Sequence, residues 1–142
     1  MLSSAIPTRR LSALHEASLA LARCHTKGEI VACITGSLDK LVHLPVQDIV
    51  WQGGGEKRSL LTNEALIRVP SPLGRTHMAE GQIVVEDGIS YVPLVAQDRL
   101  QGWVVIATIE PLDLSLAIWG MHCASALLAV DAATGDRERA VA

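Results

Sequence analysis

Residues 91–110, YVPLVAQDRLQGWVVIATIE, contain two apolar runs separated by a short polar break. The pattern predicts a β-hairpin, and apolar residues occupy both alternating sets of positions in each run. A sheet with water on one face would carry polar residues at every second position. We therefore expect both faces of the hairpin to be covered, one by helices and the other by residues 53–81. A sheet covered in this way encloses a space that suits a small ligand.

Helical patterns lie at both ends of the chain. Residues 9–25 and 29–42 have helical periodicity, and Thr26 with Glu29 three positions later is typical of a capping box before the second helix. A final helix is expected over 111–131. Helices at the ends with strands between them indicate an α+β fold.

The middle of the chain carries the strand patterns. They fall at 47–52, at 65–69, on both sides of Asp87-Gly88 within 82–95, and at 100–109. The Asp-Gly pair predicts a tight hairpin, and residues 71–81 are expected to form a loop or a single helical turn. We expect a central antiparallel sheet of five or six strands. The N- and C-terminal helices should cover one face, and a short loop or pocket layer the other.

A single domain is expected over residues 10–131, with a flexible N-terminus at 1–9 and a polar tail at 132–142. The N-terminus lacks the apolar core of a signal peptide. Residues 112–130 approach the length of a membrane span, but polar residues such as Asp113 interrupt them. A buried helix is therefore expected there, with no membrane association.

Charge and cysteine content exclude several classes of function. The formal net charge is -3 with no basic stripe, so nucleic-acid binding is not expected. Cys24, Cys33 and Cys123 are odd in number, and their spacing matches no zinc site. They predict reduced thiols in a cytoplasmic protein. The neighbours Cys24-His25 and His122-Cys123 diverge by about 100° on a helix, so no metal cofactor is expected.

The pattern VPL at 92–94, followed by a polar turn and GWVVI at 102–106, resembles the closing hairpin of a GAF domain. The stretch SPLGRTHMAEGQIVVEDG at 71–88 is similar to the segment that leads into that hairpin, and the terminal helices fit the same plan over 11–130. The resemblance implies an antiparallel sheet between a helical layer and a ligand-enclosing layer. It also implies small-molecule binding and dimerisation through the terminal helices. The region between 69 and 82 is short for this family, so a bulky ligand is not expected.

A ligand is expected between one face of the sheet and the loop 71–81. Strand alternation sends Val104 and Ile106 toward the helices and sends Trp103 and Val105 to the opposite face. The predicted ligand-binding residues are Trp51, Trp103 and Val105 on the sheet and Arg75 and His77 in the loop. The short loop favours a small ligand such as an amino-acid or carboxylate metabolite, since arginine binds carboxylates in a bidentate manner.

The final helix is apolar on nearly all sides, so one sheet face cannot cover all of its apolar surface. We expect a homodimer with Leu116, Trp119 and Leu127 in the interface. One interpretation is a non-catalytic regulatory domain that senses a small molecule and signals through its terminal helices to a signalling protein. The other is a ligand-free scaffold for dimerisation or partner docking. An open pocket favours the sensor, and an interior filled by side chains favours the scaffold.

Enzymatic activity is the least favoured interpretation. Methionine sulfoxide reductases that resemble GAF domains use cysteines close to the pocket loop. Residues 53–81 contain no cysteine, so the nucleophile that a thiol-dependent reductase needs is missing from that loop. No cofactor can be named from the sequence.

Overall fold

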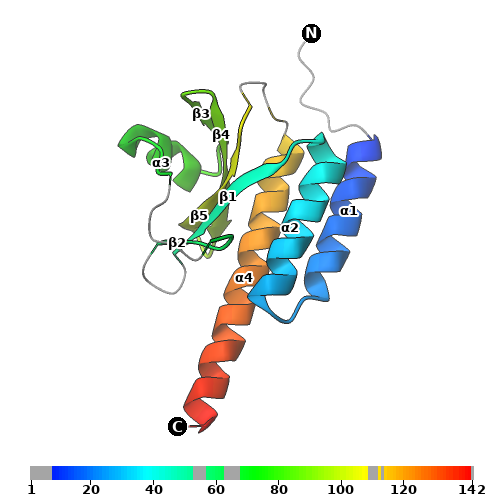
Figure 1. The fold of residues 1–142 in the computed structure, drawn as a ribbon, viewed down its shortest axis with the longest axis vertical. Coiled ribbons are helices and arrows are strands. Elements are labelled where there is room, and N and C mark those ends of the chain that lie inside the picture. The colour runs from blue at the N-terminus through cyan, green and yellow to red at the C-terminus, as the bar shows by residue number, and fades with distance from the viewer. Residues whose placement is uncertain (1–7, 53–56, 63–67, 109–111, 113, 142) are drawn as a thin grey trace.

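A five-stranded antiparallel sheet carries α1, α2 and α4 on one face and α3 on the other (Figure 1). The computed structural model describes residues 8–52, 57–62, 68–108, 112 and 114–141. The elements are α1 (Thr8–Ala22), α2 (Lys27–Val42), β1 (Val46–Trp51), β2 (Arg58–Ser59), α3 (Pro72–Ala79), β3 (Val84–Glu86), β4 (Ile89–Ala96), β5 (Arg99–Ile106) and α4 (Leu114–Val141). The strand order is β2-β1-β5-β4-β3. The predicted α+β fold class is confirmed.

Two tight turns connect β3, β4 and β5. Asp87 and Gly88 join β3 to β4 with φ of 52° and 76°, and Gln97 and Asp98 join β4 to β5 with φ of 56° and 58°. Two successive residues with positive φ are the pattern of a type I′ turn, whose twist matches that of the flanking strands. The hairpin predicted at Asp87-Gly88 is confirmed. The second turn forms at Gln-Asp, without a glycine.

β1 pairs with β5 on the side away from β4, and this pairing depends on a glycine. Val50 lies opposite Trp103, and Trp51 lies opposite Gly102. A Cβ atom on residue 102 would lie 2.0 Å from the carbonyl oxygen of Val50. Glycine at 102 therefore allows the two backbones to approach this closely.

The start of α2 follows the prediction closely. The Thr26 hydroxyl accepts a hydrogen bond from the Glu29 backbone N–H at 3.1 Å, and the Glu29 carboxylate accepts one from the Thr26 hydroxyl at 3.3 Å. These bonds satisfy donors that the first turn of a helix otherwise leaves free. The helix ends at His43, which adopts φ of 57°.

Two apolar clusters lie on opposite faces of the sheet. The larger cluster fills the space between the sheet and α1, α2 and α4. The smaller cluster lies on the α3 side and contains Val50, Met78, Ile89, Tyr91, Trp103 and Val105. Val104 and Ile106 of β5 belong to the larger cluster, and Trp103 and Val105 belong to the smaller one. The strand alternation predicted for β5 is therefore confirmed.

α3 forms where a loop or a single helical turn was predicted, and it is longer than one turn. Ser71 caps this helix by accepting a hydrogen bond from the Gly74 backbone N–H at 3.0 Å. Pro72 begins the helix, where its missing N–H is not needed. The strand expected at 65–69 lies largely outside the described residues, and Arg68 and Val69 are not in a strand.

α4 is longer than the sequence analysis predicted. It continues past the expected end at residue 131 to Val141, and Figure 1 shows its C-terminal end projecting beyond the sheet and the other helices. Residues Leu114–Ala133 are long and apolar enough to cross a membrane by length and composition. One side of this segment packs on the sheet, as in the core helix of a globular domain.

Candidate functional site

The sheet face beneath α3 is where the ligand was predicted. Trp103 is 0% exposed and Val105 is 1% exposed, and Tyr91 and Met78 are buried beside them. Trp103 and Val105 therefore lie on the predicted face. The described part of this face is packed with the protein's own side chains.

Lys57 and the backbone of Arg68 lie beside Trp103. Its indole N–H donates a hydrogen bond to the Arg68 carbonyl oxygen at 3.0 Å, and the Lys57 ammonium nitrogen lies 5.7 Å from the centroid of its ring. Burial raises the pKa of the Tyr91 hydroxyl above its ordinary value, while the charge and hydrogen bond of Arg68 oppose that rise. Glu86 and Asp87 add to the rise, so charges of both signs lie near the Tyr91 hydroxyl.

α3 carries the two polar residues predicted to select a ligand. Arg75 and His77 are both half-buried, and the buried His77 Nδ1 has no hydrogen-bond partner among the described residues. Glu86 of β3 anchors the start of α3, because its carboxylate accepts hydrogen bonds from the hydroxyl and from the backbone N–H of Ser71. These two bonds lower the pKa of Glu86.

The predicted placement of Trp51 in the ligand site is wrong. Paired residues of an antiparallel ladder point to the same side, so Val50 shares the α3 face with Trp103. Trp51 comes one position later and points to the helical face, where it joins the larger cluster. Its register against β5 was not readable from the sequence of β1.

Trp51 instead belongs to a polar junction at the point where α4 leaves the domain. Its indole N–H donates a hydrogen bond to Asp131 Oδ2 at 2.8 Å. Asp131 Oδ1 lies 2.6 Å from the Lys27 ammonium nitrogen at the start of α2. This junction, which connects β1, α2 and α4, was not predicted.

The predicted dimer-interface residues Leu116, Trp119 and Leu127 were also placed on the wrong side of α4. Each is 0% exposed and lies in the chain's own core. Gly120 lies on the same side, where a Cβ atom would lie 2.4 Å from the Pro93 carbonyl oxygen of β4. α4 therefore presents this side to the sheet, and these side chains are not available to a second protein.

The opposite side of α4 is mostly apolar and only partly covered: Leu114, Met121 and Ser125 are exposed, and Ile118 and Leu128 are half-buried. We call it the outer stripe; it comprises Leu114, Ile118, Met121, Ser125 and Leu128. Leu114 is 57% exposed and Met121 is 50% exposed. The spacing of three and four residues is that of a coiled-coil seam.

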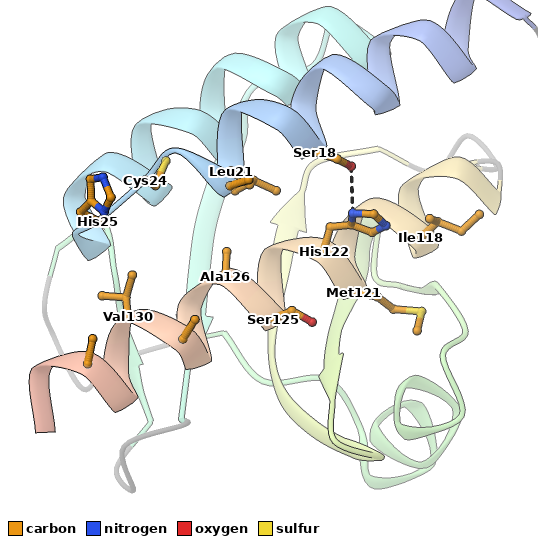
Figure 2. Close-up of a pocket in the computed structure, with 13 residues that line it drawn as sticks. Ser18, Leu21, Cys24, His25, Ile118, Met121, His122, Ser125, Ala126 and Val130 are labelled. Atoms are coloured by element: carbon orange, nitrogen blue, oxygen red, sulfur yellow. Dashed lines mark hydrogen bonds between the residues drawn. The ribbon is translucent and has the colours of Figure 1, made fainter. Parts of the chain in front are cut away.

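A groove of about 850 Å³ runs between α1 and α4 beside the outer stripe. This α1–α4 groove is lined by Ser18, Leu21, Ala22, Cys24, His25, Ile118, Met121, His122, Ser125, Ala126, Ala129, Val130 and Ala133. Figure 2 shows His122 reaching from α4 toward Ser18 of α1, and the Ser18 Oγ and His122 Nδ1 atoms are 2.8 Å apart. This pair, whose members lie 104 positions apart in the chain, was not predicted.

The three cysteines are free thiols in the helical layer. Burial raises the pKa of the Cys123 thiol well above its ordinary value and also raises that of Cys24, and nearby Cys33 adds to both shifts. A raised pKa leaves the thiol protonated and weakly nucleophilic near neutral pH. This environment is typical of structural cysteines.

The antiparallel sheet between a three-helix layer and α3 defines the class of fold, that of GAF domains. Three solved structures share it: the GAF domain of the potassium sensor histidine kinase KdpD from Escherichia coli, that of an Acinetobacter phosphoenolpyruvate-protein phosphotransferase, and that of a putative sensor histidine kinase from Pseudomonas syringae pv. tomato.

The likeness to these structures extends over most of each chain. The first has a TM-score of 0.60 at 14% identity and covers 89% of this chain and 98% of its own. The second has a TM-score of 0.64 at 12% identity and covers 92% of this chain and 99% of its own. The third has a TM-score of 0.60 at 16% identity and covers 92% of each chain. No protein-family model and no curated protein sequence matches this chain. The comparisons therefore show the fold.

Proposed function

We propose that this chain is a non-catalytic regulatory domain that associates with a second copy of itself through the α1–α4 groove. The observation that carries the proposal is that α4 has apolar residues on two opposite sides. One side is buried against the sheet, and the outer stripe is partly exposed beside a groove of about 850 Å³. A second copy presents the same apolar face, so a two-fold contact would be self-complementary.

The projecting end of α4 favours a parallel arrangement of the two copies. α1 and α4 run in the same direction, and only α4 extends beyond the body of the domain (Figure 1). If two copies of α4 run side by side in the same direction, their projecting ends lie next to each other. In an antiparallel dimer those ends would point away from each other.

The regulatory role is supported by the proteins whose domains share the fold. Two of them are sensor histidine kinases and one is a phosphotransferase. α4 is suited to pass a change in the domain to a signalling protein, because Asp131 connects it to β1 and α2 just before its projecting end. The raised pKa values of Cys24 and Cys123 support a non-catalytic role.

Met121→Lys tests the proposed interface, with Leu73→Lys as a matched control. Met121 is 50% exposed on the outer stripe, and Leu73 is 67% exposed on α3. Completing the burial of a half-exposed methionine stabilises a contact by about 1 kcal/mol, and burying an ammonium there costs more. Sedimentation should show monomer for Met121→Lys and dimer for Leu73→Lys. Equal association of both variants would contradict the proposal.

A second candidate function is binding of a small anion beneath α3. The unpartnered His77 Nδ1 favours it, together with the Lys57 ammonium near the Trp103 ring and the Arg68 charge near Tyr91. Calorimetric titration with carboxylate metabolites tests it. Arg75→Ala and His77→Ala should abolish the binding, while Arg23→Ala, at an exposed position after α1, should leave it unchanged. A carboxylate that binds all three variants equally would place the site elsewhere.

A further inference from the structure

We propose that His122 makes the self-association sensitive to pH, so that the pairing of two copies weakens when this imidazole becomes protonated. The inference rests on the proposed function, because it concerns how the α1–α4 groove is regulated. It adds a chemical signal, a fall in pH within the range in which histidine changes charge.

His122 lies where a second copy would cover it. It follows Met121 of the outer stripe, and its ring lines the groove together with Ile118 and Ala126. Figure 2 shows the ring between α4 and α1, directed at Ser18. The side chain is exposed in the single chain, so either charge state is solvated there. An apolar partner surface would remove that water.

The Ser18 hydroxyl suits both charge states of the imidazole and therefore does not decide between them. A serine hydroxyl can donate to an unprotonated Nδ1 or accept from Nδ1–H, and the two atoms are 2.8 Å apart. Ser18 holds the ring in the groove. The difference between the two states must then arise from placing a charge at an apolar contact.

The groove has no carboxylate among its described lining residues that could neutralise a protonated His122. The other titratable side chains of the lining are Cys24 and His25. Burial raises the pKa of Cys24, so its thiol stays neutral in this pH range. Near the far end of the groove, Asp131 already pairs with Lys27 at 2.6 Å.

The described charged residues of α1, α2 and β5, the other elements that pack against α4, do not line the groove. His15, Glu16 and Arg23 of the α1 region are exposed and do not line the groove. β4, which packs against the buried side of α4, has the sequence ISYVPLVA and carries no charged or histidine side chain. Among the described residues, a protonated His122 in the contact therefore has no compensating charge. The two-fold arrangement would bring in a second like charge, so acidification should favour dissociation.

The test is sedimentation of the full chain over a range of concentrations at about pH 7.5 and about pH 5.5, on either side of the ordinary histidine range. The wild-type dissociation constant should rise at least about tenfold at the lower pH, since two imidazoles per dimer must be desolvated. His122→Gln should remain dimeric at both pH values. His43→Gln, which removes an exposed histidine at the end of α2 that does not line the groove, should keep the wild-type pH dependence.

A fixed charge provides an independent check. His122→Lys should weaken association at about pH 7.5 to roughly the wild-type level at about pH 5.5, because lysine stays protonated throughout. Circular dichroism at both pH values verifies that each variant is folded. A pH dependence that persists in His122→Gln, or wild-type dimers equally stable at both pH values, would overturn the role of His122. A chain that is monomeric at every pH would overturn the proposed function as well.

Discussion

Asp131→Ala should destabilise the fold, because Asp131 is where β1, α2 and α4 meet. Its Oδ2 accepts a hydrogen bond from Trp51 Nε1 at 2.8 Å, and Trp51 is only 3% exposed. A hydrogen bond to a charged group is worth about 1.5–3 kcal/mol. The ion pair with Lys27 adds about 0.2–1 kcal/mol, since the Lys27 side chain is 44% exposed and screened by water. The free energy of unfolding should fall by about 2–4 kcal/mol.

Urea unfolding of four proteins would isolate the contribution of the Trp51 contact: wild type, Asp131→Ala, Trp51→Phe and the double variant. Once Trp51 has lost its indole N–H, removing Asp131 should cost much less, leaving a coupling energy of about 1.5–3 kcal/mol. Asp131→Asn should be milder than Asp131→Ala, because an amide oxygen still accepts from Trp51 while the ion pair is lost. Strictly additive effects, or an Asp131→Ala variant as stable as wild type, would refute the reasoning.

Three further changes test the packing. Gly102→Ala should prevent β1 from pairing with β5, since its Cβ would lie 2.0 Å from the Val50 carbonyl oxygen, and the variant should show lost sheet signal in circular dichroism. Leu127→Ala should lower the free energy of unfolding by about 2–5 kcal/mol in urea, because Leu127 is 0% exposed; a change near zero would mean that α4 is rotated. Glu86 has a pKa below its ordinary value of 4.5, so it stabilises the fold above that pH and loses this effect as the pH falls through its folded-state pKa. The stability difference between wild type and Glu86→Gln should shrink on acidification below 4.5, and a constant difference would show that the Ser71 contacts do not depend on charge.

Local chemistry explains why much of the fold was predictable. Asp87-Gly88 specifies a tight turn by itself, and Thr26 with Glu29 specifies a helix start, so both are confirmed. α3 carried a similar signal in Ser71-Pro72. With Pro70 and Pro72 close together, the sequence left both a loop and a single helical turn open there.

The candidate site was less predictable because it depends on register and helix rotation. α4 is apolar all round, so no pattern distinguishes Leu116, which faces the sheet, from Met121, which faces outward. The side of β1 that carries Trp51 follows from its pairing with β5, which is a long-range property. The pair Ser18 and His122 likewise exists only once α1 packs beside α4.

The central claim is that the outer stripe and the α1–α4 groove are covered by a second copy of the chain. Sedimentation equilibrium of the unmodified protein at micromolar concentration and neutral pH tests it most directly. The account predicts a species of twice 15.2 kDa that dissociates on dilution. A single 15.2 kDa species across the whole concentration range would contradict it.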